Sequence, residues 1–265
     1  MPYEIDLSKR VNREFVAHTS SDVLSASYRL KNRFLHIWRY PSRKSINATV
    51  DRYLNSVNGK KVLDYGCGRG HLSLNILSRG AHVCGIDISP VYISDAIQTI
   101  AQKGYPEYRY SLRVMDAHAL EYEDCTFDLV IGEGILHHLN ISVALSEIHR
   151  VLKIGGRAIF LEPLADNPLL RIFRLLTPHD RTADEKPLSK KDLMDIKKIN
   201  HWKHELKYCG ILEAPTAIFT SILTPKRMEN WPLKFADCLE RWTHYHGLLL
   251  SWNQYVLINI WKKYK

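Results

Sequence analysis

Short apolar stretches alternate with amphipathic ones between residues 60 and 163, and this alternation limits the fold more than any other feature of the chain. The apolar stretches are typical of buried strands, and the amphipathic ones are typical of helices. The predicted strands occupy residues 60–66, 82–89, 110–117, 126–134 and 157–163. The predicted helices lie at 71–80, directly after Pro90 and at 141–156. Strands that alternate with helices predict a doubly wound α/β sheet whose parallel strands end at one common edge.

The sequence on both sides of this region follows a different pattern. On the amino-terminal side, helices are predicted at residues 20–39 and from Ile46 to Val57, with Pro41 ending the first. On the carboxyl-terminal side, the predicted helices lie at 167–178, directly after Ser189 and at 233–246, and further strands lie within 205–224 and at 253–263. The two added strands bring the expected sheet to seven strands, most of them parallel.

We therefore expect one domain over residues 1–265, because the flanks look like elaborations packed on a single core. A helical lid is expected at 1–45 and the core of the domain at 46–163. A substrate-side insertion with lid elements after the fifth strand, followed by the last strands, is expected at 164–265.

The composition limits which partners, metal sites and cellular location are expected for this chain. The net charge is +9, with basic flanks around a mildly acidic middle, which indicates an acidic partner or surface near the flanks, or ordinary solvated helix faces. The five cysteines are scattered without a CxxC pair, so neither a disulfide framework nor a metal site is expected. No apolar run approaches the length of a membrane-spanning helix, and no secretory apolar segment opens the chain, so a cytoplasmic location is expected.

The turn after the first predicted strand, "VLDYGCGRGHL", indicates a ligand site. Open α/β sheets bind ligands outside the carboxyl ends of their strands. The turn carries Gly66, Gly68 and Gly70, but His71 stands where the dinucleotide-binding fingerprint requires its third glycine. Asp64 would repel a pyrophosphate at this position. The turn therefore favours a cationic nucleoside without phosphate, and S-adenosylmethionine fits that description.

Two further carboxylates follow the next strands, where such a ligand needs them. Asp87 ends the second predicted strand and can accept hydrogen bonds from both ribose hydroxyls. Asp116 ends the third strand and can accept from the adenine amino group, while the N–H of Ala117 can donate to the adenine ring. The three acids together predict an adenosyl-binding edge of the sheet.

At this point the sequence resembles the class I S-adenosylmethionine-dependent methyltransferases, and most of all their small-molecule branch, which includes quinone-biosynthesis enzymes. The likeness covers about residues 60–163, in family order and spacing. The segments that carry it are "VLDYGCGRG", "VCGIDIS", "VMDAHAL", "FDLVIGEGILHHL" and "EIHRVLKIGGRAIFLEP".

The resemblance implies a Rossmann-like methyltransferase fold and a role for several residues. It implies that Gly66 and Gly68 contact the methionine part of the ligand and that Asp64 lies near the ligand's ammonium. The remaining implied contacts are ribose at Asp87, the adenine face at Ile88, the adenine edge at Asp116 and Ala117, and the methionine part at Gly132 and Glu133. Arg69 departs from the family, in which small or hydroxyl residues are common at this position.

Catalysis needs few groups if the donor is a sulfonium. The protein must align the acceptor and exclude water, and a general base is needed only when the acceptor has to lose a proton. His137 and His138 follow the fourth predicted strand and are the candidate bases, with His138 favoured. Either histidine can instead have a structural role.

Three functions stay open on the sequence alone. The first is an enzyme that methylates O, N, C or S of a small aromatic or acidic metabolite, working as a monomer or homodimer. The second is a nucleic-acid methyltransferase that binds phosphates through its basic flanks, although no RNA-binding module and no [DN]-P-P-[YF] motif is recognisable. The third is a non-catalytic protein that binds the same cofactor. Basic helices near Arg29–Arg39 and Arg171–Arg174 also allow peripheral contact with an anionic membrane.

Overall fold

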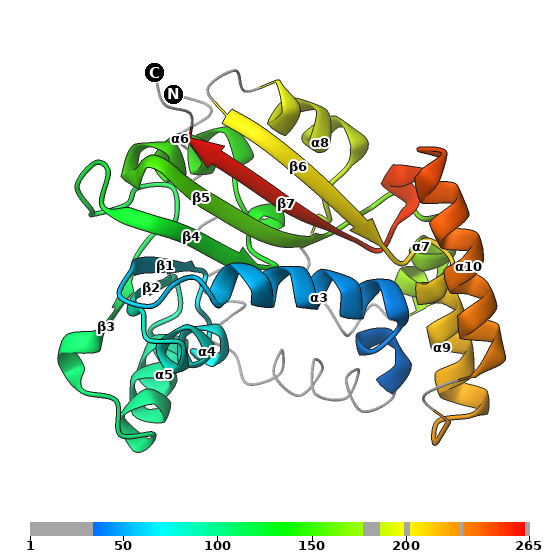
Figure 1. Cartoon of the computed structure of the whole chain (residues 1–265), viewed down its shortest axis with the longest axis horizontal. Coiled ribbons are helices and arrows are strands. Elements are labelled where there is room, and N and C mark those ends of the chain that lie inside the picture. The colour runs from blue at the N-terminus through cyan, green and yellow to red at the C-terminus, as the bar shows by residue number, and fades with distance from the viewer. Residues whose placement is uncertain (1–33, 177–185, 199–201, 228–229, 263–265) are drawn as a thin grey trace.

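A computed structural model gives the structure of the chain and describes residues 34–176, 186–198, 202–227 and 230–262. Seven strands form one sheet in the order β3-β2-β1-β4-β5-β7-β6 (Figure 1). The strands are β1 (Lys61–Tyr65), β2 (His82–Asp87), β3 (Tyr110–Val114), β4 (Phe127–Glu133), β5 (Leu152–Pro163), β6 (Trp202–Cys209) and β7 (Tyr255–Lys262). Only β7 runs antiparallel to its neighbours, β5 and β6, so the prediction of a seven-stranded, mostly parallel sheet is confirmed.

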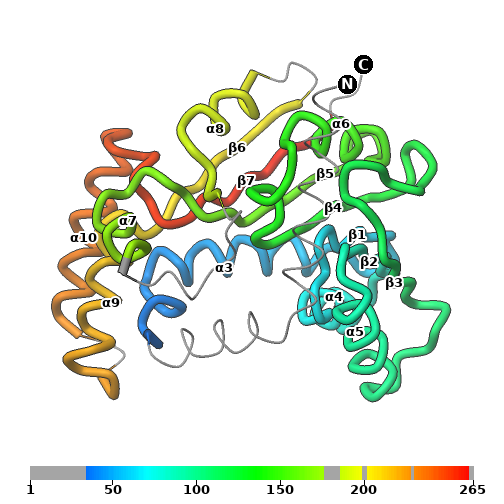
Figure 2. The backbone as a smooth tube through the Cα atoms, turned by 180° about the vertical axis from the view of Figure 1, so that it is seen from behind, coloured from blue at the N-terminus to red at the C-terminus, as the bar shows by residue number. Residues whose placement is uncertain are grey.

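Helices cover both faces of this sheet. The helices are α3 (Pro41–Leu54), α4 (His71–Ser78), α5 (Pro90–Gln102), α6 (Ile141–Val151), α7 (Pro168–Leu176), α8 (Lys190–Lys197), α9 (Glu213–Leu223) and α10 (Trp231–Tyr245). Figure 2 shows α6 and α8 on the face that lies away from α3. Helical connections carry the chain between most of the successive parallel strands, whereas a loop joins β3 to β4, and the strand carboxyl ends come to one edge.

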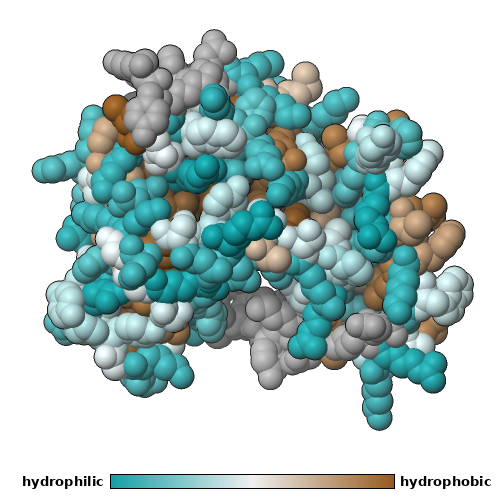
Figure 3. Space-filling view, viewed as in Figure 1, coloured by the Kyte–Doolittle hydropathy of each residue, from teal (hydrophilic) through white to brown (hydrophobic). Residues whose placement is uncertain are grey.

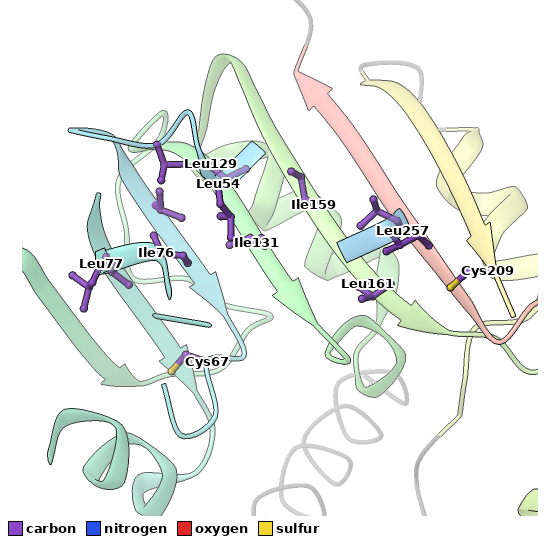
Figure 4. Packing of buried hydrophobic residues seen from close by; sticks show 14 of the residues in the cluster. Leu54, Cys67, Ile76, Leu77, Leu129, Ile131, Ile159, Leu161, Cys209 and Leu257 are labelled. Carbon is purple, nitrogen blue, oxygen red and sulfur yellow. The ribbon is translucent and has the colours of Figure 1, made fainter. Parts of the chain in front are cut away.

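Alternating side chains along each strand supply two separate cores, as expected for a sheet covered on both faces. In β1, Val62 packs with the helices α3, α4 and α5, whereas its neighbour Leu63 packs with α6 and α8. Figure 4 shows part of the first core, where Leu54 of α3 and Ile76 of α4 meet Ile131 of β4. Burial on both faces explains why these strands appear in the sequence as continuous apolar runs.

The helix predicted at 141–156 is shorter than expected, because α6 ends at Val151 and β5 begins at Leu152. Two other predicted elements also need correction. Pro41 does not end a helix but begins α3, because a proline is tolerated at the first helical position, where its missing N–H is not needed. Of the predicted helix at 20–39, only a 3₁₀ turn at Leu35–Trp38 lies in the described region, and residues 20–33 lie outside it. Helix α3 also spans the expected boundary between residues 45 and 46, so the division into lid and core stays a prediction.

The second correction concerns the strand predicted within residues 205–224. Its strand, β6, begins earlier and ends at Cys209, and the rest of the segment forms helix α9. The reason is a helical spacing of small residues, because Ala214, Ala217 and Ser221 lie buried on one face of α9. No helix in the described part of the chain has both the length and the apolar character needed to cross a bilayer.

Candidate functional site

The glycine loop between β1 and α4 is held tightly against β2. The N–H groups of Gly66 and Cys67 both donate to the carbonyl oxygen of Ile86, at 2.9 and 2.8 Å. Gly66 has a φ of +79°, and a Cβ built on it would lie 2.7 Å from the Ile135 side chain. Only glycine combines this backbone conformation with this close approach, which explains why the turn needs glycine here.

Asp87 connects this loop to the next helix. One carboxylate oxygen accepts from the N–H of Gly68 and the other from the N–H of Ser89, each at 2.9 Å. The Ser89 hydroxyl in turn caps α5 by accepting from the N–H of Tyr92. A carboxylate offers about four acceptor positions, so these two hydrogen bonds do not by themselves use up the capacity of Asp87 to accept from a ligand.

A cavity of about 210 Å³ opens at this edge of the sheet. Its walls come from the glycine loop and from the segments that follow β2, β3 and β4. The lining residues are Gly66, Ile86, Asp87, Ile88, Tyr92, Met115, Asp116, Ala117, His118, Gly134, Ile135, His138 and Leu139. Among the residues that the structure describes, the lining carries two carboxylates and neither lysine nor arginine, and most of it is apolar. The structure thus brings Gly66, Asp87, Ile88, Asp116, Ala117 and His138 together, as the sequence predicts.

His118 orients Asp116 at the cavity wall, a role that the sequence analysis missed. Its ring Nδ1 and its backbone N–H both lie 2.8 Å from the same oxygen of Asp116, and its Nε2 accepts from the N–H of Asn140 at 2.9 Å. Nδ1 is therefore the protonated nitrogen of a neutral imidazole. Burial raises the pKa of Asp116, but the hydrogen bonds from His118 outweigh it and hold that pKa below its usual value. Asp116 is accordingly an ionised acceptor.

Asp64 lies under the glycine loop and is not part of the cavity lining. One of its oxygens accepts from the Ser73 hydroxyl at 2.6 Å, and no hydrogen bond within the described region reaches Oδ1, which is buried. Burial raises the pKa of Asp64 to about 7, and the hydrogen bond from Ser73 offsets only part of this effect. A buried carboxyl with an open acceptor position favours a positive charge nearby.

Gly132 and Glu133 line a second cavity of about 280 Å³, on the side of the sheet covered by α3. Arg43 of α3 also lines it and was missed from the sequence. The Arg43 side chain is 5% exposed, and its Nη2 lies 2.7 Å from Glu133 Oε1. Its guanidinium also stacks over the Tyr255 ring, at 4.3 Å from the centroid. This ion pair places one positive and one negative group at the end of β4.

Glu162 of β5 holds the segment that follows β4. Its carboxyl oxygens accept from the N–H groups of Ile135 and Leu136, at 3.0 and 2.9 Å, and from the His137 Nδ1, at 2.8 Å. Glu162 is fully buried and His137 nearly so. His137 therefore faces Glu162, whereas His138 lines the cavity. A catalytic role for either histidine stays a prediction.

Comparison with known proteins decides the family. The model of a family described as a methyltransferase domain matches residues 56–218, which is more than half of the chain. The chain belongs to this methyltransferase family. The resemblance seen in the sequence motifs is thereby confirmed.

Relatives of this chain are known from several organisms. A 2-phytyl-1,4-naphtoquinone methyltransferase of Nostoc punctiforme is 36% identical over 124 residues, which are 45% of this chain and 54% of the relative. The aklanonic acid methyltransferase DauC of a Streptomyces strain is 37% identical over 112 residues, 41% of this chain and 50% of the relative. The chain spans between 37% and 64% of the length of the curated relatives that it matches here.

A solved structure shows the same fold. The geranyl diphosphate C-methyltransferase of Streptomyces coelicolor superposes with a TM-score of 0.58 at 16% identity, over 83% of this chain and 79% of that one. The expected Rossmann-like methyltransferase fold is therefore confirmed.

Glu162 provides the first testable prediction. Replacing it by alanine leaves several buried donors without an acceptor, at about 1–3 kcal/mol each before relaxation, so the free energy of unfolding of Glu162→Ala should fall by about 3 kcal/mol or more. Chemical denaturation measures this loss. Glu123→Ala, at an exposed acid, is the control and should change it by less than about 0.5 kcal/mol. Equal losses in the two variants would contradict the role given to Glu162.

Proposed function

We propose that this chain transfers a methyl group from S-adenosylmethionine to an oxygen, nitrogen, carbon or sulfur atom of a small metabolite. The observation that carries the proposal is the cavity at the carboxyl ends of β1, β2 and β3. It combines two carboxylates with mostly apolar walls, and neither lysine nor arginine is among the described residues that line it. Membership of a methyltransferase family supports this reaction class.

The residues present fit an adenosyl sulfonium ligand better than a phosphate-bearing one. A diphosphate favours lysine, arginine or free helix N–H groups, and a carboxylate beside it is unfavourable. Here Asp87 lines the cavity and Asp64 lies buried below the loop with one acceptor position open. An ammonium and a sulfonium are both stabilised by such negative groups.

The lining of the cavity supports several of the predicted ligand contacts. Asp87 would accept the ribose hydroxyls, Ile88 would pack on adenine, and Asp116 with Ala117 would bind the adenine edge, since all four line the cavity. Gly66 also lines it, and Gly68 lies beside it on the same loop, so both would face the methionine part.

We propose that the methionine part also approaches residues of the second cavity, on the α3 side of the sheet. Glu133 and Gly132 border the cavity behind β4, and the Arg43–Glu133 ion pair would face a zwitterionic amino-acid group with complementary charges. The buried charge of Asp64 would act on the ammonium through space rather than by lining the cavity.

Methyl transfer from a sulfonium requires the protein mainly to position the acceptor. The bound cofactor would supply a methyl group already activated on a sulfonium. The chain's residues would align the acceptor and keep water out, which the apolar lining at Ile135 and Leu139 favours. His138 lines the same cavity and would take a proton from an acceptor that has to lose one.

The acceptor is proposed to be a small aromatic or acidic organic molecule. Relatives named for a naphthoquinone and for aklanonic acid support this class. In the described part of the chain, the exposed surfaces of α9 and α10 carry many aromatic and aliphatic side chains, which suits a nucleic-acid backbone poorly. The observations therefore favour a small-molecule acceptor over the nucleic-acid alternative.

The variant Asp87→Ala tests whether this cavity binds the cofactor through its ribose. Asp87→Ala removes the proposed ribose contact and the acceptor for the Gly68 N–H, so the dissociation constant for S-adenosylhomocysteine should rise at least about tenfold. Isothermal titration calorimetry measures it. Asp195→Ala, on α8, is the matched control and should bind as the wild type does. If Asp87→Ala binds S-adenosylhomocysteine as tightly as the wild type, the assignment of Asp87 to the ribose is wrong.

The raised pKa of Asp64 predicts that the affinity for S-adenosylhomocysteine depends on pH. Because burial raises its pKa to about 7, Asp64 loses its charge as the pH falls through that value. The affinity for S-adenosylhomocysteine should therefore decrease from about pH 8 to about pH 6, by up to tenfold for each pH unit. Asp64→Asn carries no titratable group and should show a flatter profile, with the ligand's own titration common to both proteins. Parallel profiles for the two would show that Asp64 does not act on the ligand.

His138 is tested by separating chemistry from binding. If it accepts the proton, His138→Ala should lower the single-turnover rate about 100-fold and change the S-adenosylhomocysteine affinity by less than about threefold. The assay follows labelled methyl transfer to the best acceptor from a panel of phenols, naphthoquinols and carboxylic acids. His82→Ala, at the exposed start of β2, controls for loss of an imidazole. An undiminished rate would exclude the role.

A further inference from the structure

Helix α10 is apolar on both of its sides. Its inner face is buried through Leu233 and Ala236, as expected for a helix packed on a core. The opposite face carries Trp231, Phe235 and Trp242, which are 77%, 59% and 55% exposed. Positions at this spacing share one face of a helix. A helix at the surface of a monomeric domain normally has polar residues there, so this outer face calls for a partner.

The exposed apolar surface extends beyond α10. The preceding helix α9, which packs against α10, exposes Phe219, Ile222 and Leu223. We call the exposed apolar residues of α9 and α10 the hairpin surface. Figure 3 shows apolar residues along the edge of the molecule where α10 lies. A patch of this extent on two adjacent helices is typical of an interaction site rather than of scattered surface residues.

Among the described residues, the exposed charged side chains of α9, α10 and the segment between them are basic. Among the described residues from 213 to 245, the exposed charged side chains are Lys226, Arg227, Lys234 and Arg241. Of the acids there, Glu213 and Glu240 are buried, and Asp237 pairs with Arg241 at 2.9 Å. The surface therefore joins exposed tryptophans to a positive rim, which is the composition of segments that lie in a membrane interface.

We propose that the hairpin surface docks on the surface of an anionic lipid bilayer. The positive rim is complementary to anionic head groups, and the tryptophans suit the boundary between head groups and acyl chains. In a symmetric contact between two copies of this chain, the same positive rims would face each other and repel. Charge complementarity therefore favours a lipid surface over a second copy.

The position of the hairpin surface suits such docking. Figure 1 shows α9 and α10 extending past the end of β4, the end of the sheet at which the cofactor cavity lies. Peripheral contact through Arg171–Arg174 fits the structure less well, because the Arg174 guanidinium is bound to the carbonyl oxygen of Leu164 at 2.6 Å. Docking does not depend on the proposed function, although it would bring a membrane-borne acceptor near the cavity.

Vesicle flotation of the full-length chain tests this proposal. The wild type should float with vesicles of phosphatidylcholine and phosphatidylserine, bind pure phosphatidylcholine vesicles at least about tenfold more weakly, and be released by high salt. The double variant Trp231→Ser and Trp242→Ser should partition at least about tenfold more weakly into the mixed vesicles. Tyr108→Ser, at an aromatic residue that is 78% exposed next to β3, is the control and should bind as the wild type does.

Two further measurements distinguish membrane docking from self-association and from damage to the cofactor cavity. Calorimetry with S-adenosylhomocysteine should give the same affinity for the wild type and the double variant, so a failure of vesicle binding and a failure of the proposed function are distinguishable. Sedimentation in the absence of vesicles should give the same mass for both proteins. A wild type that ignores the mixed vesicles, a double variant that binds them equally well, or a dimer that the double substitution dissociates would each overturn the proposal.

Discussion

The carboxylate of Asp87 is the contact on which the site depends. It binds the N–H of Gly68 on one side and the N–H of Ser89 on the other, so it joins the glycine loop to the start of α5. The loop crosses the edge of the sheet with positive φ angles at Gly66 and Gly68, and such a conformation needs outside support. One side chain at the end of β2 provides this support and remains in the cavity wall.

Behind the cavity lies a set of buried polar groups that hold the wall in place. His118 links Asp116 to the N–H of Asn140, and Glu162 accepts from the backbone of the segment after β4. Buried polar groups are stable only when they are hydrogen-bonded, so each of these groups restricts the geometry of its neighbours. The shape of the cavity thus depends on residues outside its lining, such as Glu162, as well as on lining residues such as His118.

The helices added after β5 are anchored by another buried polar cluster. The Ser42 hydroxyl at the start of α3 lies within hydrogen-bond distance of the carboxyl groups of both Glu213 and Glu240, and Glu240 also accepts from the Gly210 N–H at 2.7 Å. Burial, followed by the nearby charge of Glu240, raises the pKa of Glu213 to about 8, so this acid is protonated at neutral pH. A hairpin fixed in this way to α3 can present an apolar outer face without losing its position.

The sequence by itself determined the parallel core, the glycine loop and the acids at the strand ends. These follow from local signals, because apolar runs, glycine turns and acids directly after strands lie close together along the chain. Asp87, Asp116 and Ile88 lie in the cavity wall as that reasoning predicts.

Only the tertiary structure decided which side chains support that wall, where the strand predicted within 205–224 ends and α9 begins, and which surface stayed apolar. Arg43 and Glu133 are 90 positions apart, and Glu162 and His137 are 25 apart, so no local pattern connects either pair. The α10 periodicity predicted a helix, but its inner and outer apolar residues became distinguishable only once α3 and α9 were packed against it. Long-range packing decides such features because burial is a property of the assembled fold and not of the local chain.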